Sequence, residues 1–151
     1  EFMAEAVWRI AQNGSSQDVI NYLSAFPDGP HAEEARRLQD GALWRDALDE
    51  RSLRSVQQYL GQFPAGKFRS AALELRTQLA WERLSELKSR AWADAYLRDH
   101  PKGPAPEEVC RLWEQEEWIS TYADGRRSAF ENYLILFPDG PHASEAKKRL
   151  R

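Results

Sequence analysis

The sequence predicts an all-α fold, an α-solenoid of about four helix pairs of 37 residues each. Two observations carry this prediction. A Tyr-Leu pair recurs at intervals of 37 residues, at 22–23, 59–60, 96–97 and 133–134. A Pro-x-Gly sequence follows each pair and begins at Pro27, Pro64, Pro101 and Pro138. Such a period is typical of helical repeats, whose single units are too small to bury an apolar face alone.

Each unit is expected to contain a short helix, a Pro-x-Gly turn and a long helix. The first short helix places Val19, Tyr22 and Phe26 on one face, because they stand at i, i+3 and i+7. Proline lacks an amide donor and disfavours the α conformation of the residue before it, so this helix should end near the Phe. Apolar residues at helical spacing from Phe68 onwards then predict a long helix. The polar stretches before the next short helices contain residues suited to N-capping: Ser15, Ser52, Ser89 and Asp124.

The large side chains that recur with the period are predicted to form the core between units. A residue repeated in every unit usually serves the contact that each unit makes with its neighbour, and each buried side chain stabilises the fold by about 1.5–3 kcal/mol. The alternative is a ladder of aromatic platforms for a ligand. The predicted core residues are Trp44, Trp81, Trp118, Tyr22, Tyr59, Tyr96, Tyr133, Leu23, Leu60, Leu97, Leu134, Phe26, Phe63 and Phe137.

Composition and motifs argue against several classes of function. The 151 residues carry a net charge of −3, which argues against broad neutralisation of nucleic-acid phosphates. No apolar run reaches the ~18 residues that cross a bilayer, so no membrane insertion is expected. The single Cys110 excludes an intramolecular disulfide and fits the cytoplasm. Residues 1–3 read as a vector scar or start, and 4–151 as one helical repeat domain.

No enzyme motif, cofactor motif or metal-ligand spacing is present in the sequence. The chain is therefore expected to be no enzyme and to hold no cofactor or metal. The three histidines are expected to be solvated or capping residues in turns. Neighbouring carboxylates point apart on a helix and are expected to form solvated faces, as in Glu33-Glu34, Glu107-Glu108 and Glu116-Glu117.

Two tryptophans stand outside the repeat and are candidates for binding a partner. Trp92 aligns with Ser55 and Ala129, whereas Trp113 aligns with Gln39 and Arg76. A partly exposed Trp near charges is typical of interface hot spots, but a compensating core substitution explains it equally well. Basic pairs provide a second candidate, a stripe for an acidic partner: Arg36, Arg37, Arg126 and Arg127.

The phrase YLxxFPxGxxxxxA, preceded by a Trp about fifteen residues earlier, resembles a degenerate tetratricopeptide-like (TPR-like) helical repeat of bacterial proteins. Such repeats occur beside caspase-like peptidase, TIR and cell-envelope domains. The resemblance implies a non-catalytic interaction scaffold of a bacterial signalling or defence protein, with another protein or a peptide as partner. The alternative is self-assembly, in which the half-helices at 4–13 and 141–151 complete each other between copies.

Overall fold

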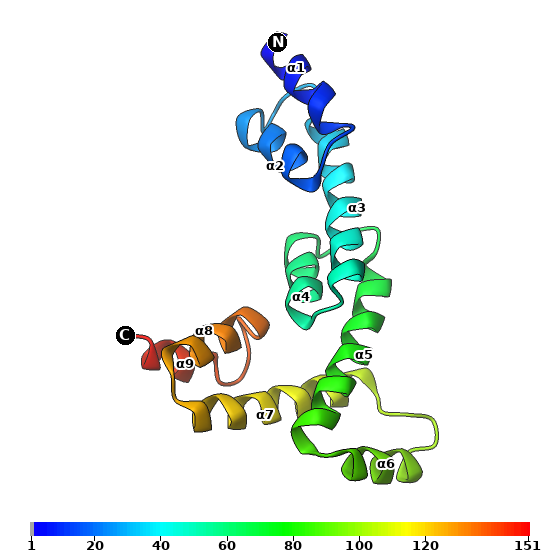
Figure 1. Cartoon of the computed structure of the whole chain (residues 1–151), viewed down its shortest axis with the longest axis vertical. Helices are drawn as coiled ribbons and strands as arrows, with labels where there is room; N and C mark the ends of the chain where they lie inside the picture. Colours follow the sequence, from blue (N-terminus) through cyan, green and yellow to red (C-terminus); the bar gives the residue numbers. More distant parts are fainter. Residues whose placement is uncertain (1) are drawn as a thin grey trace. The chain divides into compact units, whose positions relative to one another are not determined.

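The computed structural model describes residues 2–151, and in that range it contains helices and no strand. The all-α prediction is therefore confirmed (Figure 1). The chain divides into two compact units, an N-terminal unit up to Leu73 and a C-terminal unit from Glu74 onwards, and each is described by itself. The helices are α1 Phe2–Ala11, α2 Ser16–Ala25, α3 Ala32–Glu50, α4 Leu53–Gln62, α5 Arg69–Lys88, α6 Arg90–Asp99, α7 Pro106–Asp124, α8 Arg127–Leu136 and α9 Ala143–Arg149.

The helix boundaries follow the sequence period. Helices α2, α4, α6 and α8 each have 10 residues, and their first residues are spaced by 37: Ser16, Leu53, Arg90 and Arg127. The helices that follow them are spaced in the same way and begin at Ala32, Arg69, Pro106 and Ala143. The expected order of short helix, turn and long helix is thus observed from α2 to α7, whereas α9 has only 7 residues.

Each short helix ends where its Pro-x-Gly turn begins. In α2 the amide of Phe26 still donates to Tyr22 O at 2.8 Å, and the amide of Gly29 then donates to Phe26 O at 3.1 Å. Pro27 lies between them and has no amide hydrogen to continue the helix. The same two bonds form at the ends of α4, α6 and α8. The proline therefore ends the helix at the position that the sequence predicts.

Serine caps begin three of the four short helices. Ser15, Ser52 and Ser89 each accept a backbone amide of the first turn, and Ser15 forms a capping box with Asp18. An N-cap of this kind stabilises a helix by about 1 kcal/mol. The expectation was wrong for α8, whose N-cap is Arg126 without a side-chain cap. Asp124 lies two positions before this N-cap and accepts the amide of Arg126 at 3.1 Å instead.

A buried tyrosine hydroxyl supports three of the four turns. Tyr59 Oη accepts the amide of Phe68 at 3.0 Å and donates to Asp40 Oδ1 at 2.5 Å. Burial, and then the bond to Asp40, raises the pKa of Tyr59 to about 12. The hydroxyls of Tyr22 and Tyr133 accept the equivalent amides at 3.1 and 3.2 Å. The tyrosine of the short helix thereby fixes the start of the next helix.

The turn glycines make room for these hydroxyls. A Cβ atom on Gly29, Gly66 or Gly140 would lie 2.8, 2.6 or 2.8 Å from the hydroxyl oxygen of the tyrosine beneath it. Such distances are far inside van der Waals contact, so any other residue would displace the ring or the turn. These three turns therefore contain glycine because a Cβ atom would clash with the tyrosine hydroxyl.

Replacing Gly66 with alanine is therefore expected to destabilise the protein by about 1–3 kcal/mol, because overpacking strains a close-packed site. Gly41 in α3 is the matched control, since a Cβ atom there meets no heavy atom within 4 Å. Gly41→Ala should stabilise by about 0.5–1 kcal/mol, because alanine is the better helix former. Urea denaturation measures both, and equal shifts in the two variants would contradict the clearance argument.

The core of the N-terminal unit lies among α1, α2 and α3. Helix α2 packs against both α1 and α3, and α4 packs against α3 (Figure 1). The Trp8 ring lies 5.3 Å from Tyr22 and stacks on His31 at 4.9 Å. The His31 ring also bonds Glu5 at 2.9 Å. The predicted core role of Tyr22, Tyr59 and Trp44 is confirmed by their burial.

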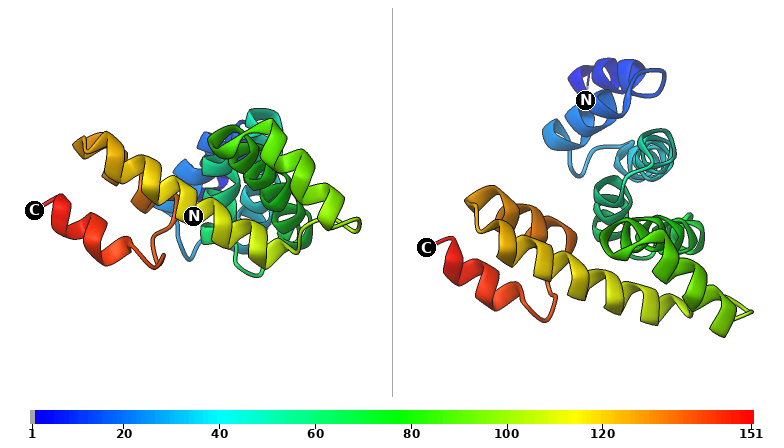
Figure 2. Two further views of the ribbon diagram at one scale, coloured as in Figure 1. Left: turned by 90° about the horizontal axis from the view of Figure 1, so that it is seen from below. Right: turned by 60° about the horizontal axis from the view of Figure 1, so that its bottom comes forward.

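In the C-terminal unit, α8 packs against α7 and α9 (Figure 2). Phe130, Tyr133 and Ala146 are buried there, with Trp118 and Phe137 packed against them. The Trp118 ring stacks on His142 at 4.7 Å, as Trp8 stacks on His31. The other predicted core residues that are partly buried are Trp81, Tyr96, Leu23, Leu60, Leu134, Phe26 and Phe63.

Candidate functional site

Helix α6 differs from the other short helices at its central core position. Val19, Val56 and Phe130 occupy this position in α2, α4 and α8, and all three are buried. Helix α6 has Ala93 instead. Since alanine lacks the methyl groups or ring of those residues, α6 fills less of the space beside its neighbouring helix.

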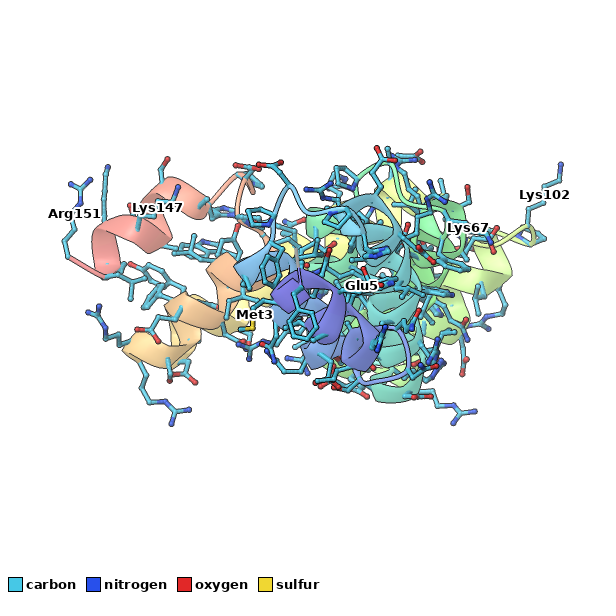
Figure 3. The ribbon with its side chains drawn as sticks, turned by 90° about the horizontal axis from the view of Figure 1, so that it is seen from above. Met3, Glu5, Lys67, Lys102, Lys147 and Arg151 are labelled. Atoms are coloured by element: carbon cyan, nitrogen blue, oxygen red, sulfur yellow. The ribbon has the colours of Figure 1, made fainter. Side chains whose placement is uncertain are left out.

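The turn after α6 also takes a different path. Gly103 has a φ of 82°, in the left-handed region that favours glycine, and it is followed by Pro104 and Pro106. Pro106 has no amide hydrogen, so it cannot form the bond that Ala32 donates to Gly29 O in the first turn. Lys102 in this turn extends into the solvent (Figure 3).

The altered turn leaves one tryptophan without its stacking partner. His31, Phe68 and His142 stack on Trp8, Trp44 and Trp118 with interplanar angles of 6, 12 and 8°. The equivalent residue after α6 is Ala105, which has no ring. One face of Trp81 therefore lacks the aromatic cover that the other three have, and Trp81 is only partly buried.

Tyr96 holds its turn less firmly than the equivalent tyrosines. Its hydroxyl oxygen is buried without a hydrogen bond of good geometry among the described residues, although burial, and then the nearby Glu108, raises its pKa. Thr77 occupies the repeat position at which Asp40 and Glu114 bind the hydroxyls of Tyr59 and Tyr133. His100, which replaces the usual Phe, still stacks on Tyr96 at 4.0 Å.

These differences open a groove of about 540 Å³ between the second half of α5 and α6. Leu97, a predicted core residue, is 41% exposed at its edge, so that prediction was wrong. The reason is the smaller Ala93 and the looser turn, which leave α6 with less to pack against. The groove is lined by Trp81, Glu82, Ser85, Glu86, Ser89, Arg90, Ala93, Asp94 and Leu97.

The groove has an apolar floor and a charged rim. Ser85 Oγ donates to Trp81 O at 2.8 Å, and Ser89 Oγ accepts the amide of Trp92 at 3.0 Å. Both hydroxyls are thus bonded within the chain and leave the floor to Trp81, Ala93 and Leu97. Such a combination of apolar surface with a few polar groups around it is typical of binding sites.

Trp92 lies beside the groove in an aromatic cluster. Its ring centroid is 5.6 Å from that of Trp81 and 5.5 Å from that of Tyr96, and Lys88 Nζ lies 5.2 Å from its centre. The side chain is half-buried. Its ring is tilted by 37° against Trp81 and does not stack on it as His31, Phe68 and His142 stack on their tryptophans. A role for Trp92 in binding a partner stays a prediction.

Trp113 is a core residue, so its prediction as a partner-binding residue was wrong. The side chain is 1% exposed, its ring lies 4.4 Å from Phe137, and its Nε1 donates to Glu117 at 2.9 Å. Val109, Trp113 and Glu117 follow one another at i+4 on the inner face of α7, and all three are buried. Trp113 is thus a substitution within the core, which was the alternative to a role in binding a partner.

Two buried glutamates of α7 were missed by the sequence interpretation. Glu117 accepts bonds from Arg83 at 2.9 and 3.2 Å, and Glu114 accepts from Tyr133 Oη at 2.6 Å. The expected solvated face is therefore wrong for Glu117. The i+4 series with Val109 and Trp113 was the signal that could have identified it, because those neighbours indicate an inward face.

The four predicted arginines each have partners within the chain. Arg36 donates to Pro27 O at 2.7 Å, and Arg37 lies 3.8 Å from Glu33. Arg126 binds Asp124 at 2.8 Å and lowers the pKa of that carboxyl to about 2. Arg127 binds Glu131 and Leu150 O, both at 3.0 Å. The two pairs belong to different compact units, and a common stripe stays a prediction.

Tyr133, Glu114 and His142 superficially resemble an acid–base site, since His142 Nδ1 lies 2.6 Å from Glu114. Tyr59 and Asp40 make the same contact, however, with Phe68 in place of the histidine. Because the geometry persists without an imidazole, its role is to hold the turn. Burial, and then Glu114, raises the pKa of Tyr133, so its hydroxyl stays protonated.

Comparisons with protein-family models, curated proteins and solved structures find no match for this chain. Over residues 2–151, no helix is both long and apolar enough to cross a bilayer. Within the same range, no three His, Cys, Asp or Glu side chains gather as potential metal ligands. The groove between α5 and α6 is the candidate functional site.

Proposed function

We propose that the chain is a non-catalytic protein-interaction module, an α-solenoid of four TPR-like helix pairs, and that the groove between α5 and α6 is its binding site. The spacing of 37 residues between the starts of equivalent helices supports the repeat architecture. The shared turns support it further, because in each of them a Pro-x-Gly sequence joins a short helix to a second helix. A repeat array offers surface without requiring a reaction centre.

The observation that carries the proposal is the apolar opening at Ala93. Trp81 is half-buried beside it, as Trp118 is in its own helix pair, whereas Trp8 and Trp44 are buried. Leu97 is 41% exposed, whereas the equivalent Leu23, Leu60 and Leu134 are half-buried. Partly exposed tryptophan in a pocket is typical of interface hot spots. The volume of about 540 Å³ also lies within the ~300–1,000 Å³ of common binding pockets.

Filling the groove tests this function. Peptides selected from a display library against the wild-type chain should bind about tenfold more weakly to Ala93→Phe, which inserts the ring that α8 has at the equivalent Phe130. Ala65→Phe is the matched control, because it adds the same ring to an exposed turn. Leu97→Ser is a second test, since an exposed side chain can be truncated with little risk to folding.

Thermal unfolding of each variant shows whether the fold is kept. If selected peptides bind Ala93→Phe and Leu97→Ser as tightly as the wild type, the groove is not the binding site. Head-to-tail self-assembly, the alternative, would appear as a mass above the 17.4 kDa of one chain. Peptide binding in the groove, by contrast, should occur with the protein as a monomer.

A further inference from the structure

The rim of the groove carries more negative than positive charge. Glu82 and Glu86 lie on the α5 side, and Asp94 and Arg90 lie on the α6 side. The carboxylates of Glu86 and Asp94 thus stand beside the guanidinium of Arg90, while Arg98 lines the adjacent hollow around Ala91. A groove of this composition favours a partner with positive charge.

Arg83 does little to reduce this negative charge. Its guanidinium binds the buried Glu117 through two hydrogen bonds, at 2.9 and 3.2 Å. Its distance to Glu86 is 3.7 Å, and the Glu86 side chain is 72% exposed. Glu117 holds the guanidinium through these two shorter contacts, so the ion pair with the largely exposed Glu86 is the longer and weaker of the two.

The length of the groove indicates what kind of segment fits. Along one wall, the part of α5 from Trp81 to its end at Lys88 spans about 10 Å at 1.5 Å per residue. Arg90 to Leu97 along the other wall span about 10 Å. Two helical turns of a partner cover this distance, with aliphatic anchors on one face.

Resting on the proposed function, we infer that the groove binds a basic amphipathic helix of a partner protein. One or two Leu-type side chains of this helix occupy the space beside Ala93 and contact Trp81 and Leu97. Lys or Arg side chains on its flanks pair with Glu86 and Asp94. The hydroxyls of Ser85 and Ser89 are both bonded within the chain, so the groove favours an aliphatic anchor over a polar one.

Two matched peptides test this inference by fluorescence anisotropy. Each is a labelled helix of about 14 residues, roughly 21 Å long, built from Leu, Ala and either Lys or Glu, with leucines in identical positions. The Lys peptide should bind about tenfold more tightly than the Glu peptide. Its affinity should fall as salt is raised from about 50 mM to about 500 mM, because salt screens the rim charges.

Charge-neutral variants show whether the rim is responsible. Glu86→Gln with Asp94→Asn should weaken the Lys peptide about fivefold to tenfold. The control, Asp28→Asn with Asp139→Asn, removes the same net charge at two exposed turn positions and should leave binding unchanged. Equal weakening by both double variants would overturn the inference, because it would show general attraction to an acidic chain.

The outcomes separate this inference from the proposed function. If both peptides bind equally and Ala93→Phe abolishes both, the groove is a binding site but its preference for a basic partner is wrong. If Ala93→Phe still binds the Lys peptide, the groove is not the binding site, and the inference of a basic partner for it is wrong as well. Binding of the Lys peptide that is lost in Ala93→Phe and weakened by Glu86→Gln with Asp94→Asn supports both.

Discussion

Trp113→Ala is expected to lower the free energy of unfolding by about 3–5 kcal/mol, the usual cost of truncating a large buried aromatic residue. The side chain is 1% exposed and contacts Phe137, so its removal leaves a cavity between α7 and the turn after α8. Glu117 also loses the Nε1 donor at 2.9 Å, although Arg83 still binds it. Urea denaturation followed by circular dichroism measures the loss.

Ile119→Ala is the matched control, because Ile119 is a large apolar residue of the same helix but is 54% exposed. Its truncation should change the free energy of unfolding by less than about 0.5 kcal/mol. If Trp113→Ala cost no more than Ile119→Ala, Trp113 would be a surface residue and the described core of α7 would be wrong.

Tyr59→Ala should cost a similar amount, about 3–5 kcal/mol. The ring is fully buried and contacts Trp44 at 5.6 Å, and the hydroxyl links Asp40 to the amide of Phe68. Truncation therefore removes core packing and the support of the turn together. Guanidinium denaturation at constant pH measures the change in the midpoint and in the slope.

Phenylalanine variants separate the hydroxyl from the ring. Tyr59→Phe removes two hydrogen bonds and should cost about 1–3 kcal/mol, because it leaves a buried amide without its acceptor. Tyr96→Phe should cost far less, since the Tyr96 hydroxyl has no hydrogen bond of good geometry among the described residues. Equal costs would show that the two turns are supported alike.

The helix order could be predicted from the sequence because its signals are local. Proline blocks the helix at Pro27 and its equivalents, and three serines cap the helices that follow. These effects depend on residues within about one turn of each other. The role of the turn glycines required the structure, because Gly66 is needed for the distant Tyr59 hydroxyl and not for a positive φ.

The position of Trp113 could not be predicted from the repeat alignment, which compares it with Gln39 and Arg76. That comparison shows that the residue is unusual but not which way it faces. Ala93 was visible in the same alignment against Val19 and Val56. A small residue does not reveal whether its neighbours fill the space beside it, and the groove at Ala93 required the structure.

The central claim is that α6 packs more loosely than the equivalent helices and thereby leaves the groove open. Amide hydrogen exchange tests it directly, with α8 of the same compact unit as the reference. The amides of α6 should exchange about tenfold faster than those of α8, because Leu97 is exposed and Tyr96 lacks its bonds to the turn. Protection of α6 equal to that of α8 would contradict the account.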